Sequence, residues 1–231
     1  MFSYLHRGRA FYAGVLRLAL PLIAQNLITT SLGLIDTLMV GTLGEAPLAA
    51  VAQANIPVFI IQLVVFGLQS GSSVLISQFW GKGDTDSINR VMGIGCYVAG
   101  AVSTLFALTM FFFPQELMGL LTDNDELIPL AAGYARIVGF SYILHSITGV
   151  YVGAHRSMEN PKLGLIIFAV SMCANTLLNW VFIFGNLGAP ALGVVGAAVA
   201  TLASRVLEFT VMVLYALFNR RFTLRFPLLL R

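Results

Sequence analysis

The sequence predicts an all-α integral membrane protein, a bundle of six transmembrane helices. Of its 231 residues, 58% are hydrophobic and only 10% are charged, and the mean hydropathy is +0.88. A soluble domain carries about 25% charged residues, and one of this length could not bury so much apolar surface. The excess must face lipid, which excludes a cytosolic enzyme, a nucleic-acid-binding module and a disordered chain. Continuous apolar runs, rather than alternating segments of about ten residues, favour helices over a β-barrel.

Six apolar stretches are long enough to cross a bilayer, because a helix spans the hydrocarbon core with about 20 residues. They cover approximately residues 14–40, 48–79, 91–113, 127–153, 163–184 and 195–218. The first stretch continues through Pro21 well past Thr30, so we expect a retained helix rather than a cleaved signal peptide. The second is long for one crossing, so we expect it to tilt or to begin at the membrane interface.

The basic residues indicate which loops face the cytoplasm. Ten of the 13 Lys and Arg residues fall on one side of the expected helix pattern. They are Arg7, Arg9, Lys82, Arg90, Arg156, Lys162, Arg220, Arg221, Arg225 and Arg231. The alternate loops, 41–47, 114–126 and 185–194, hold no Lys or Arg, and the first two of them carry Glu45, Glu116, Asp123, Asp125 and Glu126. Because basic loops remain in the cytoplasm, we expect both termini there, which agrees with an even number of helices.

The chain then divides into three segments. We expect residues 1–13 to form a cytoplasmic N-terminal tail and residues 14–218 to form the six-helix transmembrane lobe. Residues 219–231 are expected to form a basic cytoplasmic linker or tail.

Several small residues lie inside the predicted helices. Gly67, Gly71 and the run at 193–198 permit close helix approach. Cys96 and Cys173 are expected to behave as small apolar residues rather than as a disulfide.

The chain has no metal-ligand spacing, Ser/His/Asp set, H-E-x-x-H motif or Walker loop. An enzyme or an ATP-driven pump is therefore not supported, and no cofactor is expected.

One acidic residue and three neutral polar residues are predicted to meet near the outer side of the membrane. An acid inside the membrane is costly and is a functional hypothesis by default, and Asp36 is the foremost one. Asn175 and Asn179 are four residues apart and share a helix face. At 1.5 Å per residue, Asp36, Asn179 and Thr201 lie about 8 to 9 Å below the outer surface, and Asn175 about 15 Å. We predict that they line one oxygen-rich pocket.

Two coupling chemistries fit such a pocket, and a structural role fits it as well. Asp36 can carry a proton, or its carboxylate can bind Na⁺ together with amide and hydroxyl oxygens. Alternatively, the asparagines and the threonine hold helices together by hydrogen bonds, which is common in membranes.

Other charged residues inside the predicted helices have simpler expectations. Arg205 and Glu208 are three residues apart, which predicts an ion pair within one helix, with a gating or proton-relay role as the alternative. Arg17 is expected to extend toward the membrane surface, and Arg136 either to extend toward the outer acidic loop or to pair with a nearby acid. We expect His145 to be a hydrogen-bonded packing residue, and a place in a proton path is the alternative.

Several segments together resemble the multidrug and toxic compound extrusion (MATE) family. They are Leu20-Pro21, Asp36 through Gly44 with Leu48-Ala49-Ala50, Ser77 through Asp84, and Gly196 through Thr201. The resemblance implies a secondary antiporter of the cell membrane that exports lipophilic or cationic drugs and toxic compounds in exchange for H⁺ or Na⁺. Carried over by position, it implies a coupling site of Asp36, Asn175, Asn179 and Thr201, which would also ligate Na⁺ in a Na⁺-coupled protein. Some branches have a second carboxylate where this chain has Asn179, which leaves Asp36 as the sole titrating group.

Family members have twelve helices in two six-helix lobes, so the resemblance covers one N-terminal lobe. We expect a fragment or truncated half. Its expected partners are membrane lipid, small lipophilic or cationic substrates, and a missing C-terminal lobe or a second copy. Nucleic acid is not an expected partner. One alternative is a non-transporting membrane subunit or a half-transporter that needs a partner lobe. Another is a lipid-linked saccharide flippase, which would favour a strongly basic cavity, whereas only Arg136 and Arg205 are candidates here.

Overall fold

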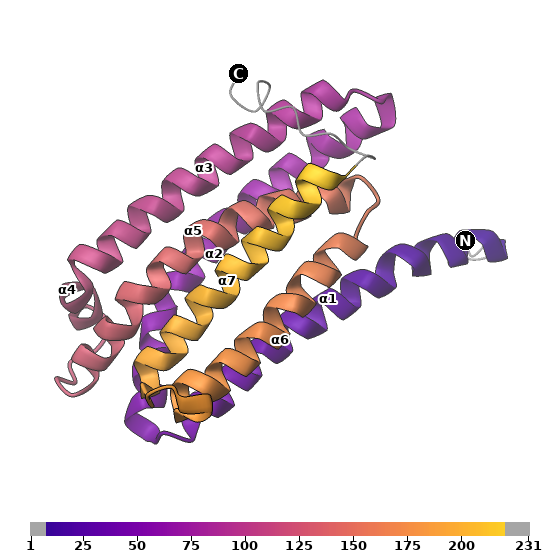
Figure 1. Ribbon diagram of the computed structural model, residues 1–231. Coiled ribbons are helices and arrows are strands. Elements are labelled where there is room, and N and C mark those ends of the chain that lie inside the picture. The colour runs from indigo at the N-terminus through magenta and orange to yellow at the C-terminus, as the bar shows by residue number, and fades with distance from the viewer. Residues whose placement is uncertain (1–7, 220–231) are drawn as a thin grey trace, which may run out of the picture.

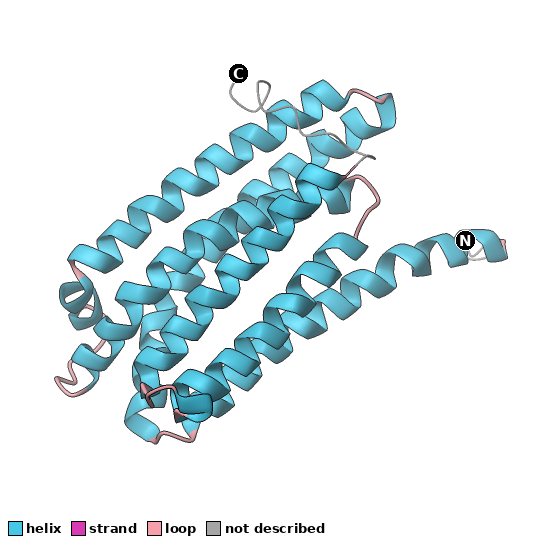
Figure 2. Ribbon diagram, in the orientation of Figure 1, coloured by secondary structure: helices cyan, strands magenta, loops and turns pink. Residues whose placement is uncertain are grey.

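The computed structural model describes residues 8–219, and this part of the chain is almost entirely helical (Figure 2). The expectations for residues 1–7 and 220–231, which include most of the predicted linker, lie outside the described residues. The six long helices are α1 (Arg9–Gly41), α2 (Glu45–Lys82), α3 (Thr85–Phe112), α5 (Leu127–Ser157), α6 (Lys162–Phe184) and α7 (Gly193–Phe218). Two short elements complete the described fold, α4 (Pro114–Gly119) and the 3₁₀ turn η2 (Asn186–Gly188).

Each predicted apolar stretch corresponds to one of these six helices, and each helix is long and apolar enough to cross a membrane. Helix α2 extends beyond both of its predicted ends, whereas α6 and α7 end at the predicted residues. Gly83 and Gly185 stop α2 and α6 in the left-handed conformation that glycine tolerates. At the other end of the chain, α1 begins at Arg9, inside the range expected for the tail.

The long helices run alternately up and down, and α5 lies at the centre (Figure 1). It packs against α2, α3 and α7, while α6 packs against α7 on one side and α1 on the other. The connections at 41–47, 114–126 and 185–194 gather at one end of the bundle, and those at 80–90 and 154–162 gather at the opposite end. This separation agrees with the grouping that the charge pattern predicted.

Helix α1 is the least embedded part of the bundle. Among its described residues only Gln25 and Val40 are buried, and its N-terminal part extends away from the other helices (Figure 1). Large apolar side chains along it are exposed, for example Leu27 at 63% and Leu38 at 70%. Because these side chains have little protein to pack against, lipid or another protein surface must cover them.

A close approach between α6 and α7 sets the register of the helices that carry the predicted site. A side chain at Gly196 would collide with the backbone carbonyl oxygen of Phe182, and the Leu192 N–H donates to that same oxygen at 2.9 Å. By contrast, nothing lies within 4 Å of a Cβ built at Gly67 or Gly71. Close packing therefore occurs at the small residues of 193–198 and not at the G-x-x-x-G pair.

Substitution of Gly196 by alanine should destabilise the bundle. The added methyl group meets backbone atoms that cannot rotate away, and overpacking of this kind costs about 1–3 kcal/mol. The free energy of unfolding can be measured in detergent by SDS titration with tryptophan fluorescence. The matched control is Gly133→Ala, since a Cβ at Gly133 meets nothing within 4 Å. Equal stability of the two variants would contradict the packing described here.

Candidate functional site

Asp36 of α1 is bonded directly to the asparagine face of α6. The Asn179 side-chain amide donates to Asp36 Oδ1 at 2.6 Å and to Asn175 Oδ1 at 3.1 Å. Asn179 is fully buried and Asn175 is 3% exposed. Because a carboxylate only accepts, the bond to Asp36 also determines which end of the Asn179 amide carries the nitrogen. The contact therefore joins α1 to α6 through a charge-assisted hydrogen bond.

Helix α7 contributes the third side of this cluster. Asn175 Nδ2 lies 3.5 Å from Ser204 Oγ, and Ser204 donates to the Thr201 carbonyl oxygen at 2.8 Å. The Tyr134 hydroxyl of α5 hydrogen-bonds to Thr201. Asp36, Asn175 and Thr201 all line one cavity of about 350 Å³, which we call the Asp36 cavity. The structure thus brings the four predicted residues together, and their function stays a prediction.

The cluster contains an acceptor that the described residues leave unpaired. Asn179 Oδ1 is buried and has no hydrogen-bond donor among them. Leaving a buried carbonyl oxygen unpaired costs free energy, so such oxygens are normally satisfied by a donor, a water or a cation. Carboxylate, amide and hydroxyl oxygens are also the ligands of small hard cations. The arrangement can hold either a proton on Asp36 or a small cation among these oxygens.

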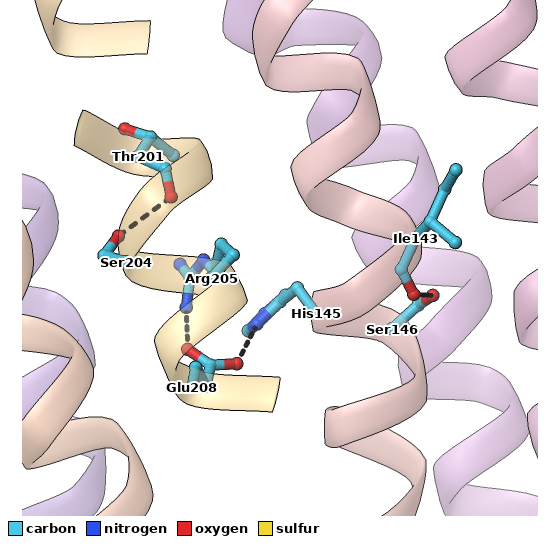
Figure 3. A network of polar contacts seen from close by, with 7 residues as sticks. All are labelled: Ile143, His145, Ser146, Thr201, Ser204, Arg205 and Glu208. Carbon is cyan, nitrogen blue, oxygen red and sulfur yellow. Dashed lines mark hydrogen bonds and ion pairs between the residues drawn. The ribbon is translucent and has the colours of Figure 1, made fainter. Parts of the chain in front are cut away.

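A second polar cluster lies deeper along α7 (Figure 3). The predicted ion pair is present, with Arg205 Nη1 at 2.5 Å from Glu208 Oε2. Glu208 is fully buried, and its other oxygen, Oε1, lies 2.9 Å from His145 Nδ1 of α5. His145 is hydrogen-bonded as expected, but its partner could not be identified from the sequence because the two residues are 63 positions apart.

Two cavities meet at Arg205. The second cavity, of about 430 Å³, includes His145 in its wall and is called here the His145 cavity. Thr29, Leu32, Gln62, Tyr142 and Arg205 line both cavities. The Arg205 guanidinium therefore lies at the boundary between the predicted coupling residues and the Glu208–His145 pair.

The remaining polar predictions concern residues away from both cavities. Arg17 and Arg136 are exposed on the outside of the bundle, and their extension toward the membrane surface stays a prediction. Cys96 and Cys173 are free, as predicted. Among the described residues, no group of three or more His, Cys, Asp or Glu side chains is placed to hold a metal ion.

The chain matches one family and its members over most of its length. A sequence model of the MatE family matches residues 21–181. The probable multidrug resistance protein NorM of Agrobacterium fabrum is 28% identical over 204 residues, which cover 88% of this chain and 44% of that protein. The multidrug resistance protein NorM of Vibrio vulnificus is 25% identical over 217 residues, which cover 94% and 47%.

Solved structures agree with the sequence relatives. An outward-facing multidrug resistance MATE family transporter of the MOP superfamily superposes with a TM-score of 0.79 at 28% identity, and the match covers 91% of this chain and 46% of that one. The chain spans about half the length of the curated relatives that it matches. The resemblance proposed from the sequence motifs is therefore confirmed at the level of the family.

Removing either partner of the Arg205–Glu208 ion pair should lower the free energy of unfolding strongly, whereas removing both should lower it by much less than the two single losses together. Removing one partner leaves the other buried without its counter-charge, which typically costs about 3–5 kcal/mol. We expect Arg205→Gln and Glu208→Gln each to lower the free energy of unfolding, and the double variant to lose much less than the sum of the two. SDS titration measures all three, with Arg136→Gln as the control because Arg136 is exposed on α5. Additive losses would contradict the pairing.

Proposed function

This chain belongs to the MatE family, and from that premise we propose that it forms the ion-coupling lobe of a secondary antiporter. It is a multi-pass integral membrane protein, and residues 8–219 contain six helices that can cross a membrane. The proposed activity is export of lipophilic or cationic drugs and toxic compounds in exchange for H⁺ or Na⁺. In the proposed orientation both termini and the loops at 80–90 and 154–162 are cytoplasmic.

The observation that carries this proposal is the bond between Asp36 and Asn179. Among the residues that the structure describes, Asp36 is the only acidic one that lines the Asp36 cavity. When a proton binds Asp36, the carboxylate charge that attracts the Asn179 amide is neutralised. When a cation binds in the cavity, that charge is shared between the cation and the amide. The strength of the contact between α1 and α6 then depends on whether the ion is bound. This dependence matters because a ligand shifts a conformational equilibrium only when it interacts differently with the two conformations.

Helix α1 is the element that such a change can move. It buries only two of its described residues, so little packing opposes its displacement relative to α6 and α7. Movement of α1 alters the walls of both cavities, because Thr29 and Leu32 line each of them. We propose that this movement alternates the access of a substrate held between this lobe and a second lobe or a second copy of the chain.

Two relatives named as multidrug resistance proteins support the proposed class of substrate. The oxygen ligands favour Na⁺ or another small hard cation, whereas a proton requires only Asp36. H⁺ and Na⁺ are therefore both proposed as coupling ions. Transport assays with a H⁺ gradient alone and with a Na⁺ gradient alone distinguish the two.

Neutralising Asp36 should abolish ion-driven transport. In proteoliposomes that hold the purified chain, we expect Asp36→Asn to lower gradient-driven export of an ethidium-like dye at least about tenfold, because the variant no longer responds to ion occupancy. The pH gradient is imposed without Na⁺, and the Na⁺ gradient is imposed at constant pH.

The matched control is Asp123→Asn, an equivalent change at an exposed residue of the 114–126 loop, which should export as the wild type does. Unchanged export by Asp36→Asn would contradict the site. An inert wild-type chain would contradict transport by this chain alone and would favour a subunit that requires a partner lobe.

A further inference from the structure

The His145–Glu208–Arg205 cluster holds a base that the proposed coupling site does not use. Glu208 has one negative charge and two cationic or potentially cationic neighbours, at 2.5 and 2.9 Å. Its burial is complete, so no solvent competes for its oxygens. A buried carboxylate between an arginine and a histidine orients both side chains and stabilises positive charge on each.

His145 is placed to take up a proton. A neutral imidazole that is bonded to an ionised carboxylate donates its Nδ1 proton, which leaves Nε2 as the basic nitrogen. The His145 side chain is 25% exposed and forms part of the wall of the His145 cavity, so protons can reach it from that cavity. Its ring also lies 6.3 Å from the Tyr142 ring and 6.1 Å from the Phe168 ring, which hold it in place.

The ionisable surroundings of His145 come from α5 and α7. They are Glu208 and Arg205 on α7, and Tyr142 one turn earlier on α5. The parts of α1, α2 and α6 that line the same cavity contribute neutral side chains. Their polar members are Thr29 and Thr30 of α1 and Gln62 and Gln69 of α2. On α3, the ionisable Cys96 and Tyr97 line a separate groove.

Arg205 connects this cluster to the Asp36 cavity. It lines that cavity together with Asp36 and also pairs with Glu208, so one guanidinium faces two acidic side chains. With His145 neutral, Arg205 and Glu208 cancel and Asp36 is left with an uncompensated negative charge. A proton on His145 brings the four groups to a net charge of zero, which a low-dielectric membrane interior favours.

From this geometry we propose that His145 is a second proton-binding site, positioned by Glu208 and linked to Asp36 through Arg205. The inference rests on the proposed function for its role in transport, but proton binding itself does not. When His145 is protonated, Glu208 is shared between two cations and its attraction for Arg205 weakens. Arg205 then acts more strongly on the Asp36 cavity, and thermodynamic linkage makes this coupling reciprocal.

Histidine NMR of the full chain in lipid nanodiscs tests the proton site directly. The chain has three histidines, and His145→Gln identifies the signal of interest. We expect His145 to titrate. Glu208→Gln should weaken its proton binding by at least about tenfold because the carboxylate partner is lost. Arg205→Gln should strengthen proton binding, because Glu208 is then no longer shared with a competing cation.

The opposite signs of these two effects separate the proposal from a structural disturbance, which would move both variants in one direction. Asp36→Asn should weaken proton binding at His145 by a few fold, typically about fivefold. Arg136→Gln, on the exposed face of α5, should leave the titration unchanged. An absent titration of His145, or equal signs for Glu208→Gln and Arg205→Gln, would overturn the site. An unchanged titration in Asp36→Asn would overturn the link.

Transport then tests the role of His145. In the proteoliposome assay, His145→Gln should alter the pH profile of dye export, while Arg136→Gln keeps it. If Asp36→Asn abolishes export but His145→Gln keeps the wild-type pH profile, the role of His145 in coupling is refuted and the proposed function stands. If the wild-type chain exports nothing, transport by this chain alone is contradicted, and the NMR titration alone decides the proton site.

Discussion

The hydrogen bond from Asn179 to Asp36 is the contact on which the position of α1 against α6 depends. Helix α1 buries only two described residues, so few apolar contacts hold it. It meets α6 at Gln25, which lies against Gly164, and again at Asp36, eleven residues later. At the second point the Asp36 carboxylate and the buried Asn179 amide satisfy each other, and leaving either unpaired is expensive. A change in the charge of Asp36 therefore acts on the most weakly packed helix of the bundle.

The same requirement explains the order of polar groups along α7. Thr201, Ser204, Arg205 and Glu208 lie on successive turns and connect the asparagines of α6 to His145 of α5. The close packing of α6 and α7 at Gly196 holds these turns in register. The lobe therefore has a closely packed part, α6 and α7, which carries most of the polar groups, and a loosely packed part, α1, which carries Asp36.

Much of this could be predicted from local sequence features, and the rest depends on which helices are neighbours. Hydropathy identified the six helices, and counting residues from their ends placed Asp36, Asn179 and Thr201 at one depth. Periodicity placed Arg205 next to Glu208. The bond from His145 to Glu208 requires that α5 pack against α7, which neither hydropathy nor spacing indicates. Similarly, the glycine pattern permits close packing at Gly67 and Gly196 alike, and only the three-dimensional arrangement distinguishes them.

The most direct measurement of the central claim is the distance between α1 and α7 as the ion occupancy of Asp36 changes. Spin labels at the exposed positions Leu20 and Leu217, with Cys96 and Cys173 replaced by serine, report this distance by pulsed electron resonance. The account predicts that the distance distribution changes with pH or with Na⁺ in the wild-type background and stays in one state in Asp36→Asn. A distribution that is unchanged by either ion, or that changes equally in the variant, would contradict it.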